Sequence, residues 1–510
     1  MKSRKTLRAI TGIVLCGLGF LLALPKAYRE KTYLIPAGGC RLETTIIEKQ
    51  ARASQGTVVL FHGISANKKI MSYLARGFAE QNLRVYVPDS PGHGHSPGPF
   101  SPERAEQCGE ALLEGLMARG MINPARTILA GHSMGGAIAL RVGGRIPVAG
   151  VVAISPAPMR TAHGVSPEMM LYRDLPALPQ RFLVISGSLE LESMRGNAAD
   201  LVSSPQIPSP KDMATKYVEI PHATHVSVLF SRQVVRTFQN WTAGILQLKN
   251  TPGLPTLRQF LGALTGFVGL LFLANPFLRE ATAKKQTDDA DDTTESGNPI
   301  ALGRMLAEFA AVALAAVVLL RFWNPLRALR LFQGDYLAGF FLIVGIALVL
   351  PHWKSLPEQF SRMQVGLLAA FFAGLILFLL FSAWFELSLY EAWLPAAKWL
   401  RFPFLFLALI PYHLAEELCL GSATACRPPR RILAGLSLRL VTWGALAVGV
   451  FYLHSGEFLM VLLGPYFALV YALQRRGMDI VRQETRSPAA AAVFGAILLA
   501  GFCLVIFPVT

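Results

Sequence analysis

The segment Gly131-His132-Ser133-Met134-Gly135 combines a hydroxyl nucleophile with a glycine two positions to either side. It follows a short apolar run, 127–130, and leads into 136–141, which we expect to be helical. A serine between a strand and a helix can occupy a strained turn that exposes its hydroxyl, and the glycines let the two elements approach closely. The amide of Met134 would then face a developing oxyanion. The pattern predicts a catalytic Ser133; the alternative is a glycine-rich turn without chemistry.

The elements needed to position this serine are visible in residues 28–250, where strand-like and helix-like segments alternate. The expected strands are 31–36, 41–48, 57–61, 84–88, 127–130, 148–154, 181–186 and 216–220, and further expected helices are 71–80, 102–119 and 226–248. The first two strands suit an antiparallel pair around Gly38-Gly39. The fold class is therefore α/β, with a mostly parallel sheet covered on both faces.

Composition separates this segment from the rest of the chain. The 510 residues are 53% hydrophobic and 16% charged, and long apolar runs dominate 254–510. The net charge of +16 is spread over short loops between these runs, which suits anionic lipid headgroups and topology control. We therefore expect membrane lipids, and not nucleic acid, as partners. Of the six cysteines, Cys40 and Cys108 lie in the α/β part; we expect them to be free, although a bond between them is open if this part is exported.

The first 27 residues predict a cytoplasmic tip and an uncleaved signal anchor. Four basic residues precede the apolar stretch 9–24, and no A-x-A site follows it. Basic residues before a single anchor keep the N-terminus inside, so residues 28–250 are expected outside the cytoplasm.

The second half predicts a multi-span, all-α membrane region. After a transmembrane helix within 251–280, an acidic disordered linker occupies 281–300, and the spans continue through 301–510. With the N-terminal anchor, the apolar runs give about nine spans: 9–24, 255–275, 303–323, 335–351, 364–385, 399–418, 432–453, 456–474 and 489–508. His413, Glu416 and Glu417 near the end of one run are interpreted as a charge cluster close to the headgroups.

Residues 30 to 248 resemble the α/β-hydrolase superfamily, and within it the group that contains monoglyceride lipases and serine aminopeptidases. Three segments carry the resemblance: Phe61-His62-Gly63, the loop from Asp89 to Ser96, and Gly131 to Gly136. Together these motifs are specific for the superfamily, but they do not specify a substrate. The resemblance implies a chain order of nucleophile, acid and base.

The resemblance also implies the remaining members of a triad. The family pattern after the strand 182–186 places the acid at Glu190, a glutamate where aspartate is commoner, and Glu192 is a close competitor. The family pattern after the last strand places the base at His225, with His222 at the usual glycine position. By the same resemblance, the amide of Ile64 joins that of Met134 in the oxyanion hole, while His62, Gly63 and His132 shape the pocket.

These residues predict nucleophilic catalysis through an acyl-enzyme, with no cofactor and no metal. Between residues 154 and 181 there is room for a small cap, whose apolar residues could cover an acyl chain or pack on the sheet: Met159, Met169, Met170, Leu171 and Tyr172. We predict a membrane-anchored serine esterase acting on a lipid-like acyl substrate. The alternatives are a serine aminopeptidase-type hydrolase and a non-catalytic transport or scaffold protein with a ligand-sensing α/β domain.

Overall fold

The computed structural model describes residues 2–24, 27–49, 54–159, 170–172, 177–203, 215–249, 252–283, 302–355, 364–421, 428–453 and 457–510. The chain divides into two compact units. The α/β unit comprises Phe20–Ala263, Phe385–Ala392 and Pro508–Thr510, and the helical unit comprises Met1–Gly19, Leu264–Trp384 and Trp393–Phe507. The α/β unit therefore contains the predicted range 28–250 together with two short segments from far along the chain. The acidic linker predicted at 281–300 lies almost entirely outside the described residues.

An eight-stranded, mostly parallel sheet forms the centre of the α/β unit, as predicted. Its strands stand in the order β1-β2-β4-β3-β5-β6-β7-β8, and only the pairs β1–β2 and β2–β4 are antiparallel. Their bounds are β1 Tyr28–Ala37, β2 Cys40–Lys49, β3 Thr57–Phe61, β4 Arg84–Pro88, β5 Thr127–His132, β6 Gly150–Ile154, β7 Phe182–Gly187 and β8 Lys216–Ile220. Because β3 to β8 are parallel, their carboxyl ends meet at one edge, where loops can converge on a common site.

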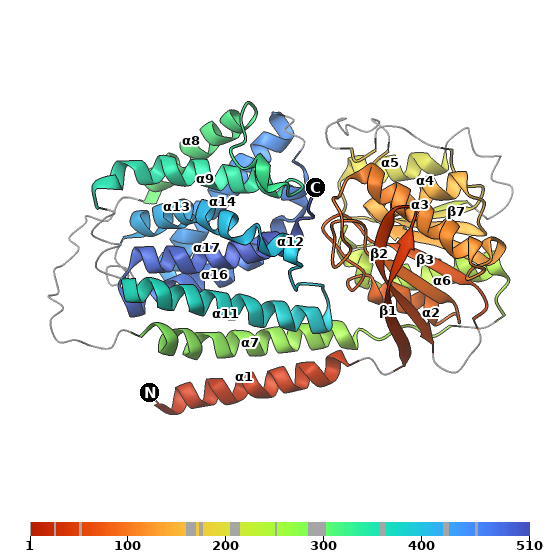
Figure 1. Cartoon of the computed structure of the whole chain (residues 1–510), viewed down its shortest axis with the longest axis horizontal. Helices are drawn as coiled ribbons and strands as arrows, with labels where there is room; N and C mark the ends of the chain where they lie inside the picture. The colour runs from red at the N-terminus through yellow and green to blue at the C-terminus, as the bar shows by residue number, and fades with distance from the viewer. Residues whose placement is uncertain are drawn as a thin grey trace. The chain divides into compact units, whose positions relative to one another are not determined.

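Helices cover both faces of this sheet (Figure 1). They are α2 Ser72–Ala79, α3 Pro102–Ala118, α4 Met134–Arg145, α5 Glu192–Val202 and α6 Arg232–Leu246. The central strands read as continuous apolar runs because both of their faces are buried. Val58 and Leu60 belong to the core shared with α2 and α6, whereas the ring of Phe61 lies against Gly109 of α3. Alternation along the strands thus divides the core into two layers.

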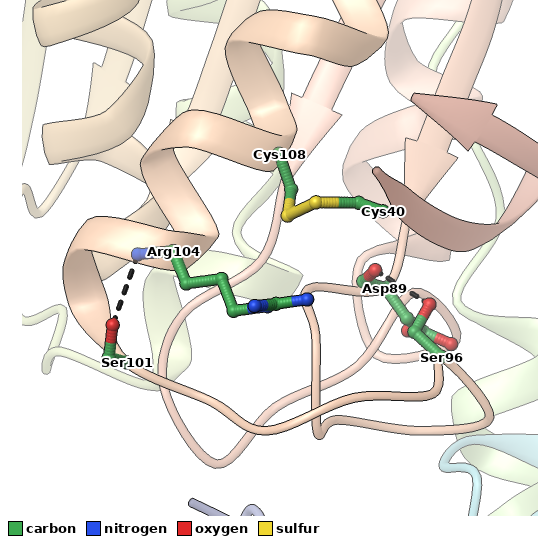
Figure 2. The surroundings of a disulfide bond; sticks show 6 residues. All are labelled: Cys40, Asp89, Ser96, Ser101, Arg104 and Cys108. Carbon is green, nitrogen blue, oxygen red and sulfur yellow. Dashed lines mark hydrogen bonds between the residues drawn. A yellow bond between two sulfur atoms is a disulfide. The ribbon is translucent and has the colours of Figure 1, made fainter. Parts of the chain in front are cut away.

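A disulfide joins Cys40, at the start of β2, to Cys108 in α3, with the two Cα atoms 5.8 Å apart (Figure 2). The expectation that both thiols are free was wrong. The bond closes a loop of 68 residues, and a stretch that long gives no local signal of which cysteines will meet. The hairpin turn between β1 and β2 carries Cys40 to α3, where a Cβ on Gly38 would lie 2.6 Å from the side chain of Ala111.

The helical unit is a bundle of long apolar helices (Figure 1). Its helices are α1 Lys2–Ala23, α7 Arg258–Thr282, α8 Leu302–Leu320, α9 Gly334–Val349, α11 Gln364–Ser388, α12 Ala396–Trp399, α13 Phe402–Leu420, α14 Pro428–Tyr452, α15 Leu459–Leu462, α16 Gly464–Thr485 and α17 Pro488–Ile506. Three of them, α1, α7 and α11, have one end among the residues of the α/β unit. α13 packs against α9 and α17, and α17 also packs against α16. Since 94% of its apolar window is buried, α17 lies at the centre of the bundle.

Eight helices among the described residues are long and apolar enough to cross a membrane. They match eight of the nine predicted runs. The remaining run, 456–474, is divided between α15 and α16, because Pro465 opens a new helix at its first turn. α16 then continues through Arg475, Asp479 and Arg482, which removes it from the candidate spans.

The charges of α13 are buried inside the helical unit. His413, Glu416 and Glu417 have no exposed surface, so these groups meet protein partners; their depth relative to lipid headgroups stays a prediction. Glu416 is paired with Arg439 at 2.8 Å and with Arg475 at 3.1 Å. The partners come from α14 and α16, and the pairing of opposite charges is what makes burial of carboxylates tolerable in an apolar bundle.

Candidate active site

Ser133 occupies the strained turn that its sequence predicts. It stands between β5 and α4 with φ 54° and ψ −119°, a conformation that residues with a side chain rarely adopt. The flanking glycines are sterically required. A Cβ on Gly131 would lie 2.1 Å from the carbonyl oxygen of Gly135, and a Cβ on Gly135 would lie 2.3 Å from that of Phe61. The turn therefore presents the Ser133 side chain at the carboxyl edge of the sheet.

The structure brings Ser133, His225 and Glu190 together from three loops at this edge. His225 Nε2 lies 3.0 Å from Ser133 Oγ, and His225 Nδ1 lies 3.4 Å from Glu190 Oε2. All three residues are buried, with at most 8% of their surface exposed. The imidazole thus stands between a hydroxyl and a carboxylate, each within reach of one ring nitrogen.

The residues predicted for the oxyanion hole lie next to this serine. A Cβ on Gly63 would be 3.0 Å from Ser133 Cβ. The backbone of the loop after β3 therefore packs directly against Ser133, with little room for a side chain at position 63. Ile64 follows in the same loop and is buried. Met134 is the first residue of α4, where the amide has no partner within the helix.

A comparison with protein families now adds to this geometry. The sequence model of the Alpha/beta hydrolase family matches residues 58–264. Residues 58–264 are an alpha/beta hydrolase family domain. This result fits the observed sheet order and the nucleophile turn, and it covers the three loops that carry Ser133, Glu190 and His225.

Solved structures similar to this hydrolase domain cover a little under half of the chain. A serine hydrolase without a lid from Xanthomonas campestris is 18% identical, with a TM-score of 0.33, and covers 45% of this chain and 99% of its own. An esterase from Thermogutta terrifontis is 18% identical, with a TM-score of 0.32, and covers 42% of this chain and 99% of its own. An esterase from Pyrobaculum calidifontis is 16% identical, with a TM-score of 0.35, and covers 48% of this chain and 93% of its own. At these values the likenesses say nothing about the activity of this chain.

Glu190 of the hydrolase domain has the surroundings of a buried anion. Its Oε1 accepts hydrogen bonds from the Ser155 hydroxyl at 2.5 Å and from the Gly187 amide at 2.7 Å. Burial alone would raise the pKa of Glu190, but the hydrogen bonds with His225, Ser155 and Gly187 outweigh it, and the pKa lies below its usual value. Glu192, the competing candidate, is exposed at the first position of α5.

His222, the second histidine of its loop, does not reach the site. It is exposed and has φ 57°, a left-handed conformation that favours glycine. His222 therefore stands where a glycine would fit, as the resemblance implied, while His225 three residues later is directed inward.

Two further histidines of the hydrolase domain are buried beside the site and neutral. His132 Nε2 lies 2.8 Å from the carbonyl oxygen of His225, and His62 Nε2 accepts from the amide of Ser90 at 2.9 Å. Burial lowers the pKa of His62 to about 4; burial and the nearby His225 lower that of His132 to about 3. These rings position loops around the triad and carry no charge near neutral pH.

The described residues of the predicted cap pack against the domain itself. Met159 and Met170 are buried, and the ring of Tyr172 lies 4.6 Å from the Arg141 guanidinium while its hydroxyl donates to the carbonyl oxygen of Pro102. Leu171 is half-buried, and Met169 lies outside the described residues. Tyr172 therefore contributes to packing on α3 and α4.

Sequence reasoning missed the groups that support the triad and its loop. Ser155 directly follows β6 and donates to Glu190, yet nothing in its local sequence distinguishes it from other serines. Lys68, five residues after Gly63, is buried among three carboxylates, those of Glu43, Asp89 and Glu391. A lysine close behind the Phe61-His62-Gly63 motif was the available signal, but its partners are remote in sequence.

Proposed function

We propose that the α/β unit is a serine hydrolase that cleaves acyl esters through Ser133, His225 and Glu190. The observation that carries this proposal is the position of His225, with one ring nitrogen 3.0 Å from Ser133 Oγ and the other 3.4 Å from Glu190. These distances are those at which an imidazole can take the serine proton while a carboxylate fixes its tautomer.

The steps follow from this arrangement. Ser133 Oγ attacks the acyl carbonyl while His225 takes its proton, and the tetrahedral oxyanion accepts hydrogen bonds from the amides of Met134 and Ile64. The protonated His225 then gives its proton to the leaving alcohol, and the C–O ester bond breaks. Water, activated by His225, attacks the acyl-enzyme, releases the carboxylic acid and restores the serine. Glu190 remains ionised throughout and stabilises the imidazolium.

The membrane favours a lipid-like substrate. The chain joins the main segment of the α/β unit to candidate spans at Thr6–Ala23 and Arg258–Thr282, which would keep the hydrolase within a few residues of a bilayer. Tethering of this kind raises the local concentration of amphiphiles without any new contact. The Cys40–Cys108 disulfide supports an extracytoplasmic location for the unit, since such bonds persist in oxidising compartments.

Labelling with a fluorophosphonate tests the proposal on full-length protein in detergent. The wild type should be labelled and should hydrolyse a p-nitrophenyl acyl ester, whereas Ser133→Ala should lose both, with kcat reduced by about 10⁶-fold. Ser203→Ala, at an exposed serine at the end of α5, is the matched control. Undiminished hydrolysis by Ser133→Ala would refute the proposal that Ser133 is the nucleophile. Faster cleavage of amino-acyl anilides than of any acyl ester would favour the aminopeptidase hypothesis over the esterase hypothesis.

A further inference from the structure

The loop from His62 to Lys68 sets the position of one predicted oxyanion donor. Gly63 lies against Ser133, and Ile64 follows it. The next residue, Ser65, has φ 55° without being a glycine, so the loop holds a conformation that its own sequence does not favour. Such a conformation persists only where surrounding contacts enforce it. The contacts that enforce it are therefore part of the site.

The segment Phe385–Ala392 supplies those contacts within the α/β unit. Tyr390 Oη donates to the carbonyl oxygen of Ser65 at 2.8 Å, and Asn67 Nδ2 donates to the carbonyl oxygen of Glu391 at 3.4 Å. The Lys68 ammonium binds the Glu391 carboxyl group. Three of the four positions 65–68 are thus held by two adjacent residues that are more than 300 positions away in sequence.

The Lys68 ammonium is the centre of this attachment. Besides Glu391 it contacts Glu43 Oε2 at 2.6 Å and Asp89 Oδ2 at 2.5 Å, while the Asp89 carboxylate also accepts the Lys68 backbone amide at 2.7 Å. The side chains of Lys68, Asp89 and Glu391 are at most 2% exposed. A buried ion pair of this kind is costly to break, because one charge is then left without a partner.

Glu43, His95 and Glu391 also lie close enough together to suggest a metal site. However, the Lys68 ammonium already binds two of these carboxylates. Burial and the adjacent Asp89 carboxylate raise the pKa of Glu391, which reduces the negative charge that a cation would need. The cluster is therefore interpreted as an attachment point for the loop.

We propose that Tyr390 and Glu391 are positioning residues of the hydrolase site, which hold the loop 62–68 so that the amide of Ile64 meets the oxyanion formed at Ser133. This inference rests on the proposed function. It also means that a fragment of residues 28–250 carries the whole triad but lacks the support of its oxyanion loop. Hydrolysis depends on a segment that directly continues α11, one of the candidate spans.

The expected effect is on the transition state alone. An oxyanion donor acts only when the carbonyl oxygen becomes charged, so its displacement lowers kcat and leaves KM unchanged. Complete loss of one donor costs about 10²- to 10³-fold in kcat. A loop that is loosened but still present should lose less, roughly 10-fold for Tyr390→Phe and more for Glu391→Ala.

Steady-state kinetics on the full chain in detergent test the proposal, with the active enzyme counted by titration with a fluorophosphonate. Tyr390→Phe, which removes one hydroxyl, should lower kcat per active site with KM unchanged, and the affinity of a trifluoromethyl ketone should fall by the same factor. Glu391→Gln keeps an acceptor for Lys68 and should retain most of the activity that Glu391→Ala loses. Tyr33→Phe, at a half-exposed strand residue, is the matched control.

The outcomes separate this inference from the proposed function. If the wild type is not labelled, or if Ser133→Ala hydrolyses as well as the wild type, the proposed function fails. If the wild type is active and both Tyr390→Phe and Glu391→Ala retain its kcat per active site, the positioning role is refuted. A smaller fraction of active enzyme with unchanged kcat per site would likewise overturn it, because it indicates support of folding only.

Discussion

Two buried glutamates, Glu190 in the α/β unit and Glu417 in the helical unit, show how environment assigns different roles to one residue type. Glu190 contacts a hydroxyl, a backbone amide and the imidazole of His225. Glu417 instead binds the guanidinium groups of Arg431, at 2.5 Å, and of Arg475. Arg475 also contacts Asp479 at 2.7 Å, so charges from three helices are compensated together.

The difference lies in whether the carboxylate is already neutralised. Neutral donors stabilise Glu190 as an anion but leave its charge able to attract the imidazolium that the proposed mechanism forms at His225. The two arginines neutralise Glu417 in the resting protein, so its charge serves the packing of α13, α14 and α16. The comparison teaches that burial alone does not mark a reactive carboxylate; the charge of its partners does.

The largest expected effect is on the turnover number, and it tests whether Glu190 differs from Glu417 as described. Glu190→Gln should lower kcat by about 10⁴-fold, because an amide cannot stabilise the imidazolium and favours the wrong histidine tautomer. Thermal unfolding should change little, since the amide replaces the carboxylate at equal size. Glu192→Gln, at an exposed position two residues away, should leave kcat unchanged in the same p-nitrophenyl ester assay. The reverse result would move the acid to Glu192.

A smaller effect, on stability, is expected for Glu417. Glu417→Gln leaves Arg431 and Arg475 with an uncompensated buried charge and should destabilise the helical unit by roughly 3–5 kcal/mol. Glu308→Gln, which breaks an exposed pair with Arg304 one helical turn away, should cost about 0–1 kcal/mol. Thermal unfolding in detergent measures both. A loss of kcat per active site in Glu417→Gln without loss of stability would contradict the distinction drawn here.

The disulfide separates effects on stability from effects on turnover within the α/β unit. It lies in the same unit as Ser133, His225 and Glu190, and it is expected to affect stability alone. Replacing Cys40 and Cys108 by serine should cost about 4 kcal/mol, since the closed loop restricts the unfolded chain. The kcat per active site should stay at the wild-type value. Mass spectrometry of protein alkylated after unfolding without reduction checks the bond: Cys40 and Cys108 should stay unmodified until reduction, and free thiols at both positions would refute it.

A smaller effect per residue is expected in the pH dependence of stability, to which His62 and His132 both contribute. Their pKa values in the folded protein lie near 4 and 3, below the ordinary value of 6.5. The unfolded chain therefore takes up protons first, so stability is complete above pH 6.5 and falls as the pH drops toward these values. Between pH 6.5 and 5 each histidine should cost about 2 kcal/mol.

Thermal unfolding at pH 7.5 and pH 5 measures this dependence. His132→Gln should make the decline shallower and leave the part caused by His62, whereas His222→Asn, at an exposed loop position, should leave it unchanged. An equally steep decline in His132→Gln would show that His132 is not buried in its neutral form.

The parts of the site that follow from local sequence could be predicted. The strand, the turn and the helix around Ser133 are contiguous, and the glycines at positions 131 and 135 are explained by contacts within the turn and with β3. The strands of the sheet were predicted because buried β-branched runs separated by helices leave few alternatives. The roles of His225 and Glu190 were predicted through a family pattern, and the structure places both beside Ser133.

The features that were missed depend on contacts between distant residues. The disulfide joins positions 68 apart, and the segment at Tyr390 and Glu391 contacts a loop more than 300 residues earlier. The partners of the α13 charges were missed for the same reason, since these arginines lie on two other helices. Apolar periodicity reports whether a helix is buried, but it does not report which charges will meet.

The segment Pro508–Thr510 belongs to the α/β unit but is synthesised long after the main segment of that unit. The amide of Phe100 donates to the carbonyl oxygen of Val509 at 2.6 Å, beside the loop that carries Asp89 and His93. Synthesis at roughly 5–20 residues per second needs about 10 to 50 seconds to proceed from Ala263 to Val509. During that interval Ser133, His225 and Glu190 are already present on the growing chain, while Tyr390, Glu391 and Val509, which contact the neighbouring loops, are not. These contacts of the α/β unit therefore form only after the residues of the helical unit have been made.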